Sequence, residues 1–307
     1  MHTPPPSHNP ARSHQLAFVL GSGGVRSIAA LGIAERLAHE GIRPDLIAGC
    51  SSGALFGAQI ACGMQGERAV RLATTLWSAE LTQQRRWRAY AQIIAPRLAG
   101  FGSDFALRDD RLIAERLQLA FGDILLEHLP TPMRVATTEA ATGLPVVLKQ
   151  GRLVDALRAS MAVPILFPSV SMEGRQLVDG VLSDPLPIAA ASDAHVILTL
   201  GFHGSMPRRV DRFSRLVART STTLINNLMQ SRIDAMRARG QHVIDFQLQL
   251  DRHIGLWETS AMPYLFEAGQ RAAEERLPDI WAALEASPAV HERARPQTWD
   301  PAGAKAA

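Results

Sequence analysis

The stretch that most constrains the fold of this chain is residues 45–64, with the sequence DLIAGCSSGALFGAQIACGM. Residues typical of a strand run directly into Gly49-x-Ser51-x-Gly53, and a helix of small and apolar residues follows. A strand that reverses into a helix within one residue brings the two backbones together, so Gly49 and Gly53 stand where a Cβ atom would collide. The pattern predicts a nucleophile elbow that presents Ser51 at a helix N-terminus, where free N–H groups stabilise developing negative charge.

The pentapeptide by itself also arises by chance in a chain rich in Ala, Gly and Ser. The strand before it and the helix after it favour a catalytic serine over that alternative.

Length and composition are those of a globular protein with either one large α/β domain or two small ones. The chain has 307 residues, of which 47% are hydrophobic and 20% charged. A formal net charge of +3 is too small to indicate nucleic acid as a partner. The two cysteines, Cys50 and Cys62, lie in the elbow strand and its helix, where disulfide geometry is not available. We therefore expect buried thiols in a reducing compartment.

The composition of the two ends of the chain predicts the domain boundaries, and the apolar runs bear on the cellular location. Residues 1–14 are rich in Pro, His and Ser and lack the apolar core of a signal peptide. We expect a flexible N-terminal tail over 1–14, a single domain over 15–286 and a flexible C-terminal tail over 287–307. No run reaches the roughly 18 apolar residues of a membrane span. The expected location is cytoplasmic, with peripheral contact at the inner membrane surface left open.

The elements around the elbow alternate between strand and helix. The apolar run 16–20 predicts a buried strand, GSGG a loop, and 27–40 a helix, which together with the elbow strand form a βαβ unit. The later elements are predicted as a hairpin over 133–151, a short helix over 154–162, strands over 176–180, 195–202 and 243–250, and helices at the end of 184–191, over 211–239 and over 263–286.

A basic and aromatic cluster lies in a helical segment, 68–119, that is broken at 99–104. Its members are Arg85, Arg86, Trp87, Arg88 and Tyr90. Such a cluster suits contact with anionic lipid headgroups. A solvated helix face with a partly buried tryptophan is the interpretation that the sequence favours.

The Gly-rich loop after the first strand has two possible uses. A dinucleotide fingerprint would place Arg26 where a third Gly or Ala is needed, and the next strand ends at Gly49 without an acid for a ribose. The loop is better suited to an oxyanion hole, for which Gly23 and Gly24 can supply N–H donors beside the elbow.

A serine nucleophile needs a base. The core histidines lie at strand ends, where a surface or satisfied histidine is the ordinary finding; they are His195, His203, His242 and His253. Asp179 instead ends a strand and precedes Gly180, so its carboxylate is expected at a sheet edge that a ligand can approach. A turn or N-cap aspartate remains the alternative for Asp179.

Several motifs in order resemble the patatin-like phospholipase family over about residues 15–285. They are LGSGGVRSIAALG, IAGCSSGALFGA, ATTEAATGLPVVLKQG, LRASMAVPILFPSV and LVDGVLSDPLP. The resemblance implies a three-layer α/β/α fold with a mostly parallel central sheet. It also implies a Ser-Asp dyad without histidine that hydrolyses acyl esters of lipids, and it requires neither a metal nor a cofactor.

The resemblance assigns a role to each motif. The nucleophile is Ser51 and the base is Asp179. The oxyanion donors and supporting residues that it implies are Gly23, Gly24 and Val25 in the loop, Arg26 at the family's basic position, and Gly49, Gly53 and Gly180 in the two turns.

Three residues depart from the family pattern. Ser22 and Ser27 replace glycines of the loop, and serine tolerates a positive φ poorly. Ser27 is a candidate N-cap for the helix that follows. Val181 stands after Gly180 in place of a smaller residue, so we expect it to narrow the acyl pocket.

The predicted function is that of a serine lipid acyl hydrolase whose substrate is a phospholipid or related lipid ester. The hydroxyl of Ser51 is expected within hydrogen-bond reach of Asp179, with no histidine nearer, and burial is expected to raise the pKa of Asp179. Ser52 is expected to contribute chiefly its backbone. A regulatory or lipid-binding protein without catalysis and a Ser-His-Asp esterase remain alternatives, and the oligomeric state stays open.

Overall fold

The computed structural model describes residues 14–100, 102, 105–204 and 211–287. The predicted flexible tails, 1–14 and 287–307, therefore lie outside the described residues except for their innermost positions. The strands are β1 (His14–Leu20), β2 (Leu46–Cys50), β3 (Met133–Glu139), β4 (Pro145–Leu148), β5 (Val170–Met172), β6 (Arg175–Asp179), β7 (Ala194–Leu200) and β8 (His242–Asp245).

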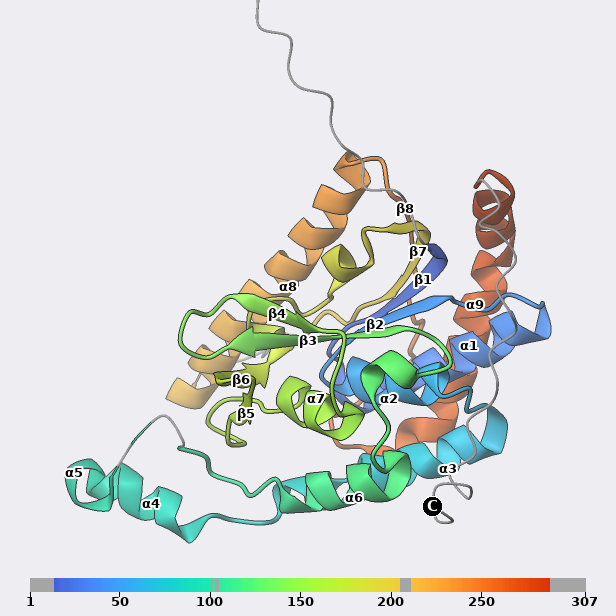
Figure 1. Ribbon diagram of the computed structural model, residues 1–307. Helices are drawn as coiled ribbons and strands as arrows, with labels where there is room; N and C mark the ends of the chain where they lie inside the picture. The colour runs from blue at the N-terminus through green and yellow to red at the C-terminus, as the bar shows by residue number, and fades with distance from the viewer. Residues whose placement is uncertain (1–13, 101, 103–104, 205–210, 288–307) are drawn as a thin grey trace, which may run out of the picture.

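The helices alternate with these strands through most of the chain (Figure 1). The α-helices are α1 (Ala29–His39), α2 (Ser52–Ala61), α3 (Gly66–Leu76), α4 (Trp87–Ile94), α5 (Pro96–Ala99), α6 (Arg111–Phe121), α7 (Leu153–Ser160), α8 (Phe213–Ala238) and α9 (Met262–Glu285). The short 3₁₀ helices are η1 (Gly24–Ile28), η2 (Ala79–Thr82), η3 (Leu126–His128), η4 (Gly180–Leu182), η5 (Ile188–Ala191) and η6 (Thr259–Ala261).

The strands form one eight-stranded sheet in the order β5-β6-β3-β2-β1-β7-β8, with β4 paired to β3 off this path. Strands β3, β2, β1, β7 and β8 pair in parallel, whereas β4, β5 and β6 add antiparallel partners at one side. The predicted mostly parallel sheet, the β1–α1–β2 unit and the hairpin of β3 and β4 are confirmed.

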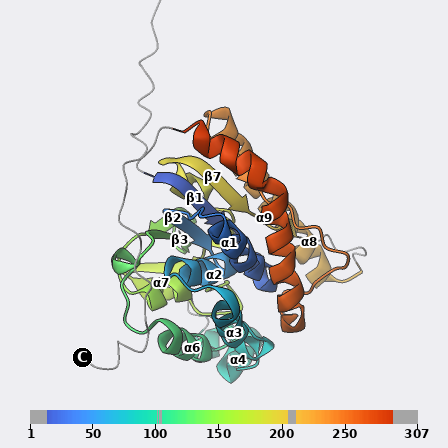
Figure 2. The same cartoon turned by 90° about the vertical axis from the view of Figure 1, so that its right-hand side faces the viewer.

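Helices cover both faces of the sheet because the central strands are apolar on both sides. Along β1, Leu16, Phe18 and Leu20 belong to a core cluster shared with α1, α2 and α9. Ala17 and Val19 point to the other face, where a second cluster joins η5 and α8. Figure 2 shows α1 and α9 beside each other on the first face. The predicted three-layer α/β/α fold is therefore confirmed.

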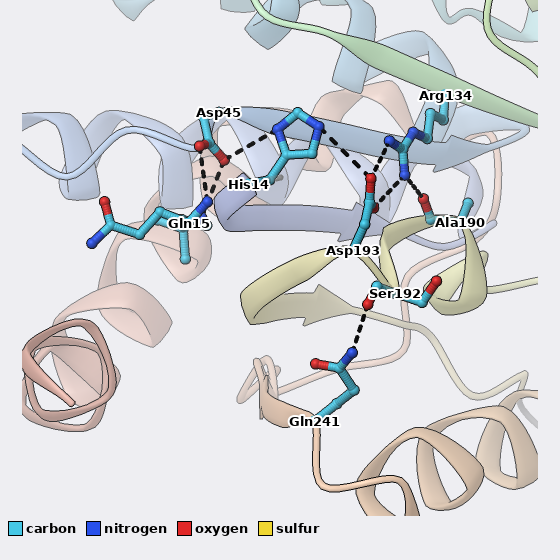
Figure 3. Close-up of polar contacts among 9 residues, drawn as sticks. His14, Gln15, Asp45, Arg134, Ala190, Ser192, Asp193 and Gln241 are labelled. Atoms are coloured by element: carbon cyan, nitrogen blue, oxygen red, sulfur yellow. Dashed lines mark hydrogen bonds and ion pairs between the residues drawn. The ribbon is translucent and has the colours of Figure 1, made fainter. Parts of the chain in front are cut away.

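A polar network holds the N-terminal ends of the strands, at the opposite end of β1 from the Gly-rich loop (Figure 3). The Asp45 carboxylate accepts the backbone N–H of Gln15 at 2.9 Å, and Arg134 pairs with Asp193 through two bonds of 2.6 and 2.7 Å. The His14 ring lies 3.8 Å from Asp45 and 3.9 Å from Asp193. These contacts explain why β1 begins at His14, which the sequence assigns to the tail.

Three predicted elements differ in extent. The helix predicted from residue 27 is the 3₁₀ helix η1 followed by α1, and the helix predicted within 184–191 is the short 3₁₀ helix η5. Strand β8 ends at Asp245 rather than 250, because its neighbour β7 ends at Leu200 and leaves no partner for further residues. Among the described helices, none is both long enough and apolar enough to cross a bilayer.

Candidate active site

The turn between β2 and α2 has the geometry that the sequence predicts for a nucleophile elbow. Ser51 adopts φ 54°, a left-handed conformation that costs free energy in any residue with a Cβ atom. A Cβ atom on Gly53 would lie 2.4 Å from the carbonyl oxygen of Leu20, and one on Gly49 would lie 2.5 Å from the Cα of Ala54. The steric role predicted for both glycines is confirmed.

The Ser51 hydroxyl donates a hydrogen bond of 2.7 Å to Oδ2 of Asp179. The two residues meet because β6 pairs with β3 through Asp179 and Thr137, and β3 lies directly beside the elbow strand β2. Ser51 is 6% exposed and Asp179 is fully buried. The predicted proximity of hydroxyl and carboxylate is therefore confirmed, whereas their catalytic roles remain a prediction.

The Asp179 carboxylate is buried but not isolated. Its Oδ1 accepts the backbone N–H of Val181 at 2.8 Å and faces the thiol of Cys50 at 3.8 Å. Burial raises the pKa of Asp179 from 3.8 to about 7, although the bonds from Val181, Ser51 and Cys50 favour the ionised form. A pKa near neutrality is what a carboxylate needs to act as a base at physiological pH.

Ser160 supports the elbow from behind, a role that the sequence did not reveal. Its hydroxyl accepts the backbone N–H of Ser51 at 2.8 Å and donates to the carbonyl of Ala136 at 2.7 Å. Two residues further on, the carbonyl of Ala162 accepts the N–H of Asp179 at 3.0 Å. The motif LRASMAVPILFPSV contains both residues, but its helical pattern carries no signal that distinguishes them.

The Gly-rich loop is held by a pair of buried serine hydroxyls. Gly23 N–H donates to Ser52 Oγ at 3.1 Å, and Ser52 Oγ lies 2.9 Å from Ser27 Oγ. Ser27 Oγ in turn reaches the carbonyl of Gly21 at 3.4 Å. Two expectations are therefore wrong: Ser52 contributes its side chain, and Ser27 is not an N-cap, because its hydroxyl is occupied inside η1 and Ile28 precedes α1.

The three predicted oxyanion donors are not equivalent. The N–H of Gly23 is engaged by Ser52, and that of Val25 donates to the carbonyl of Leu256 at 3.0 Å. Within the part of the chain that the structure describes, the N–H of Gly24 has no recorded acceptor. Gly24 also has φ +62°, so the left-handed position of the loop falls on a glycine and not on Ser22.

Arg26 ties the loop to the end of β7. Its Nε donates to the carbonyl of Gly23 at 3.2 Å, its Nη1 to the carbonyl of His203 at 3.4 Å, and its guanidinium lies 5.0 Å from the ring centroid of Phe202. Burial lowers the pKa of Arg26. These contacts give Arg26 a role in holding the loop.

A second buried acid lies near the site. Asp184 is buried, and Arg232 lies 3.8 Å from its Oδ1. Among the described residues, this oxygen has no hydrogen-bond partner. Burial raises the pKa of Asp184 to about 6. Burial raises the pKa of Cys50, and the charges of Asp179 and Asp184 raise it further. In sequence, Asp184 stands directly before Pro185 in a loop and gives no signal of burial.

Among the described residues, no group of three or more His, Cys, Asp or Glu side chains is arranged to hold a metal ion.

Comparison with known proteins places this site in a family. A sequence model described as patatin-like phospholipase matches residues 18–192, which include the Gly-rich loop, the elbow and Asp179. The chain belongs to the patatin-like phospholipase family. The family resemblance stated from the motifs is confirmed.

Two mycobacterial relatives are described as uncharacterized NTE family proteins. The one from Mycobacterium bovis is 32% identical over 188 residues, which cover 61% of this chain and 48% of the relative. A second, from Mycobacterium tuberculosis, is 31% identical over 208 residues, covering 63% of this chain and 33% of the relative. The chain spans about half or less of the length of these curated relatives.

A mammalian relative and a solved structure complete the comparison. Patatin-like phospholipase domain-containing protein 7 of Rattus norvegicus is 28% identical over 190 residues, covering 60% of this chain and 13% of the relative. The crystal structure of VipD from Legionella pneumophila matches with 13% identity and a TM-score of 0.45, covering 86% of this chain and 67% of that chain.

Proposed function

We propose that this chain is a serine lipid acyl hydrolase that cleaves carboxylic esters of phospholipids or related lipids through Ser51 and Asp179. The observation that carries the proposal is the 2.7 Å hydrogen bond from the strained elbow serine to a buried carboxylate. The pKa of Asp179, raised to about 7 by burial, supports its use as the base. Membership of the patatin-like phospholipase family supports a lipid ester as the substrate.

The proposed reaction has two stages. In the first, Ser51 Oγ attacks the ester carbonyl carbon while Asp179 takes the hydroxyl proton, and the tetrahedral intermediate then expels the alcohol, which receives that proton. In the second, Asp179 takes a proton from water, whose oxygen attacks the acyl-enzyme. The carboxylic acid leaves and Ser51 regains its proton. Asp179 is ionised at the start and at the end of the cycle.

We assign the oxyanion donor of the loop to Gly24. Its N–H lies at the start of η1 and meets no acceptor among the described residues, whereas the N–H groups of Gly23 and Val25 are engaged elsewhere. Loss of one oxyanion donor typically costs about 10²–10³ in rate, so the loop conformation is a large part of the catalysis proposed here. Gly23 and Arg26 then act as positioning residues for Gly24.

We propose that the acyl hydrolase domain spans residues 15–286, because the described sheet and its covering helices extend from β1 to α9 without a dividing linker. The relatives are longer than the matched region. Activities that their remaining segments confer are not assigned to this chain.

One observation favours a second candidate, a lipid-binding protein without catalysis. Two of the three expected oxyanion donors are occupied within the protein, which would leave a weak oxyanion site if the loop does not adjust when an ester binds. The two candidates differ in whether Ser51 is an activated nucleophile.

Labelling with a fluorophosphonate probe tests this difference, because only an activated serine reacts. We expect covalent labelling of the wild-type protein at Ser51, located by mass spectrometry of the peptide, and no labelling of Ser51→Ala. Hydrolysis of a short p-nitrophenyl ester is expected to disappear in parallel. Ser171→Ala, at an exposed serine on β5, is the matched control and should label normally. Absence of Ser51-dependent labelling and turnover in the folded protein would favour the lipid-binding candidate.

A further inference from the structure

An arm of the structure, residues 85–100, contains α4 and α5 and exposes large apolar side chains. Figure 1 shows these two helices at the periphery, away from the sheet. Trp87 is 73% exposed, Ile94 84% and Leu98 92%, whereas the sequence favoured a partly buried tryptophan on a solvated face. Trp87 is therefore exposed, and the expectation of a partly buried tryptophan is wrong. Large apolar side chains that are exposed together on one element mark an interaction surface more often than side chains exposed singly.

The charge of the arm has one sign. Residues 81–100 contain four arginines and no aspartate or glutamate. Trp87 also packs beside Tyr90, with ring centroids 5.7 Å apart. Arginine, tryptophan and tyrosine next to exposed aliphatic residues are the composition of segments that lie in the interface of an anionic membrane.

A second element repeats this combination. In the N-terminal half of α8, four apolar residues follow one another at helical spacing along one face, and each is more than two-fifths exposed: Phe213, Leu216, Val217 and Leu224. Three arginines accompany them, and residues 212–224 contain no acidic residue. Asp211, just before the helix, pairs with Arg215 at 2.7 Å.

Backbone hydrogen bonds connect the arm to the segment that holds Asp179. The N–H of Arg86 donates to the carbonyl of Leu107 at 3.1 Å, and the N–H of Leu107 donates to the carbonyl of Ile165 at 2.8 Å. The segment of Ile165 follows Ala162, whose carbonyl accepts the N–H of Asp179. The side chain of Ile165 is itself 64% exposed. The arm is thus joined by a short path of backbone contacts to the carboxylate side of the site.

The exposed half of α8 is connected to the other side of the site. Asn226, just after the apolar stripe, exchanges two hydrogen bonds with the backbone of Gly204, of 2.8 and 3.2 Å. The adjacent residue, His203, accepts the bond from Arg26 of the Gly-rich loop. Leu256, which contacts Gly24, is another exposed apolar residue at this side.

We propose that the arm and the N-terminal half of α8 dock the protein onto an anionic phospholipid membrane. Arginine heads pair with lipid phosphates while the apolar side chains enter the interface. A second copy of this chain is a poorer occupant, because a two-fold interface would bring each arginine-rich face against its own copy. The purpose of docking rests on the proposed function, since it would deliver lipid esters to Ser51.

Vesicle flotation of the full chain tests the docking surface. The Ser51→Ala protein is used throughout, so that substrate turnover does not alter the vesicles. We expect binding to phosphatidylcholine vesicles that contain phosphatidylglycerol, weakened by high salt, and little binding to pure phosphatidylcholine. Arg85→Gln combined with Arg88→Gln should weaken binding at least tenfold, since each arginine near an anionic surface contributes about fivefold.

The apolar residues are tested with matched controls. Trp87→Ala and Leu98→Ser on the arm should each lower vesicle binding severalfold and reduce penetration of tryptophan into the bilayer, measured by quenching with brominated lipid. Trp281→Ala on α9 and Leu119→Ser on α6 remove comparable exposed side chains outside the two docking elements and should leave binding unchanged. Circular dichroism of each variant confirms that the fold is retained.

The experiments distinguish failure of the docking proposal from failure of the proposed function. If Ser51-dependent hydrolysis is absent but vesicle binding depends on Arg85 and Trp87 as expected, the docking proposal stands and the proposed function falls. Equal binding of arm variants and controls overturns the docking proposal. A wild-type dimer in the absence of lipid that the arm variants convert into a monomer also overturns it, because the surface would then be a protein interface.

Discussion

The elbow and the Gly-rich loop are two turns of similar composition that differ in what holds them. Each joins a buried strand to a helix, and the strands β1 and β2 are parallel neighbours. In the elbow, backbone atoms around Gly53 leave no space for a Cβ atom. In the loop, Ser52 Oγ accepts the backbone N–H of Gly23, and Ser27 Oγ donates to the carbonyl of Gly21. The loop also has a glycine with no space for a Cβ atom, since one on Gly23 would lie 2.1 Å from the ring of Phe202. It nevertheless admits serine at position 27, where the hydroxyl finds hydrogen-bond partners.

This difference explains the departures from the family pattern. Ser27 and Ser22 stand in the loop, where neither adopts a positive φ and where Gly24 supplies the left-handed position. The glycines at 49 and 53 of the elbow are retained, because substitution there meets backbone atoms that cannot move aside. The two turns touch through Ser52, which belongs to the elbow helix and bonds the loop.

The largest expected effect concerns the carboxylate that the elbow hydroxyl contacts. Asp179→Asn should lower kcat/KM for a soluble ester by about 10²–10⁴-fold, the usual contribution of a general base. In the wild-type protein, kcat/KM should fall about tenfold per pH unit below 7, because the protonated carboxyl cannot accept the Ser51 proton. A pH–rate profile that stays flat down to pH 5 would contradict the assignment of Asp179 as base.

The same substitution should raise stability at high pH. The pKa of Asp179 is higher in the folded protein, about 7, than its ordinary 3.8, so folding favours the protonated form. This stabilisation is present below about pH 4 and is lost as the pH rises through 7. Asp179→Asn stays neutral, so its Tm should exceed that of the wild type at pH 8.5 but not at pH 4. The shift in pKa sets a ceiling of about 4 kcal/mol on the gain.

A substitution in the elbow tests whether close backbone packing restricts position 53 to glycine. Gly53→Ala places a Cβ atom against the carbonyl oxygens of Leu20 and Gly21, so we expect a loss of about 3 kcal/mol or more in the free energy of unfolding. Gly255→Ala is the control, since its Cβ atom would meet nothing within 4 Å. Equal unfolding free energies of the two variants in urea would show that the elbow is not sterically closed.

Substitutions that disturb the Gly-rich loop should have a smaller effect, and that effect should appear in kcat. Ser52→Ala removes the acceptor of the Gly23 N–H, and we expect kcat to fall about tenfold with little change in KM, because a misplaced oxyanion donor costs less than a lost one. Ser27→Ala and the double variant complete a double-mutant cycle, in which the contacting hydroxyls should couple by about 0.5 kcal/mol or more. Ser52→Thr, which keeps a hydroxyl, should restore part of kcat.

Ser22→Ala is the matched control for that cycle, because the backbone N–H of Ser22 is held by the carbonyl of Pro185 whatever its side chain. Its kcat should stay close to that of the wild type. Additive effects of Ser27→Ala and Ser52→Ala would mean that hydrogen bonds between the two hydroxyls do not set the loop.

The smallest expected effect is on the preference of the enzyme for long or short acyl chains in the ester. Val181 is half-buried next to Asp179, and Val181→Ala keeps the backbone N–H that bonds the carboxylate. We expect the ratio of kcat/KM for a long over a short p-nitrophenyl ester to rise about two- to fivefold, since removed methyl groups free space for acyl carbons. This ratio cancels differences in the fraction of active enzyme. An unchanged ratio would show that Val181 does not narrow the acyl pocket.

Sequence reasoning performed well where local rules decide the structure. The elbow could be predicted because a strand, two glycines and a helix follow one another within twenty residues, and the steric demand is local. Asp179 could be proposed because it ends a strand and precedes a glycine. The arm was misjudged because helical periodicity does not reveal whether another element covers a helix, and Trp87 has no such cover.

By itself, the sequence determined most of the strands and helices in order, the strained turn at Ser51 and the residue types available for an acyl transfer. It did not predict β5, nor the division of 68–119 into α3, α4, α5 and α6. Only the tertiary structure decided which partners these residues meet. The contact of Ser160 with Ser51 and that of Ser27 with Ser52 each join residues that are far apart along the chain. The burial of Asp184 likewise depends on distant elements that cover it. The physical reason is that hydrogen bonds and desolvation depend on neighbours in space, which strand pairing brings together and which no local pattern encodes.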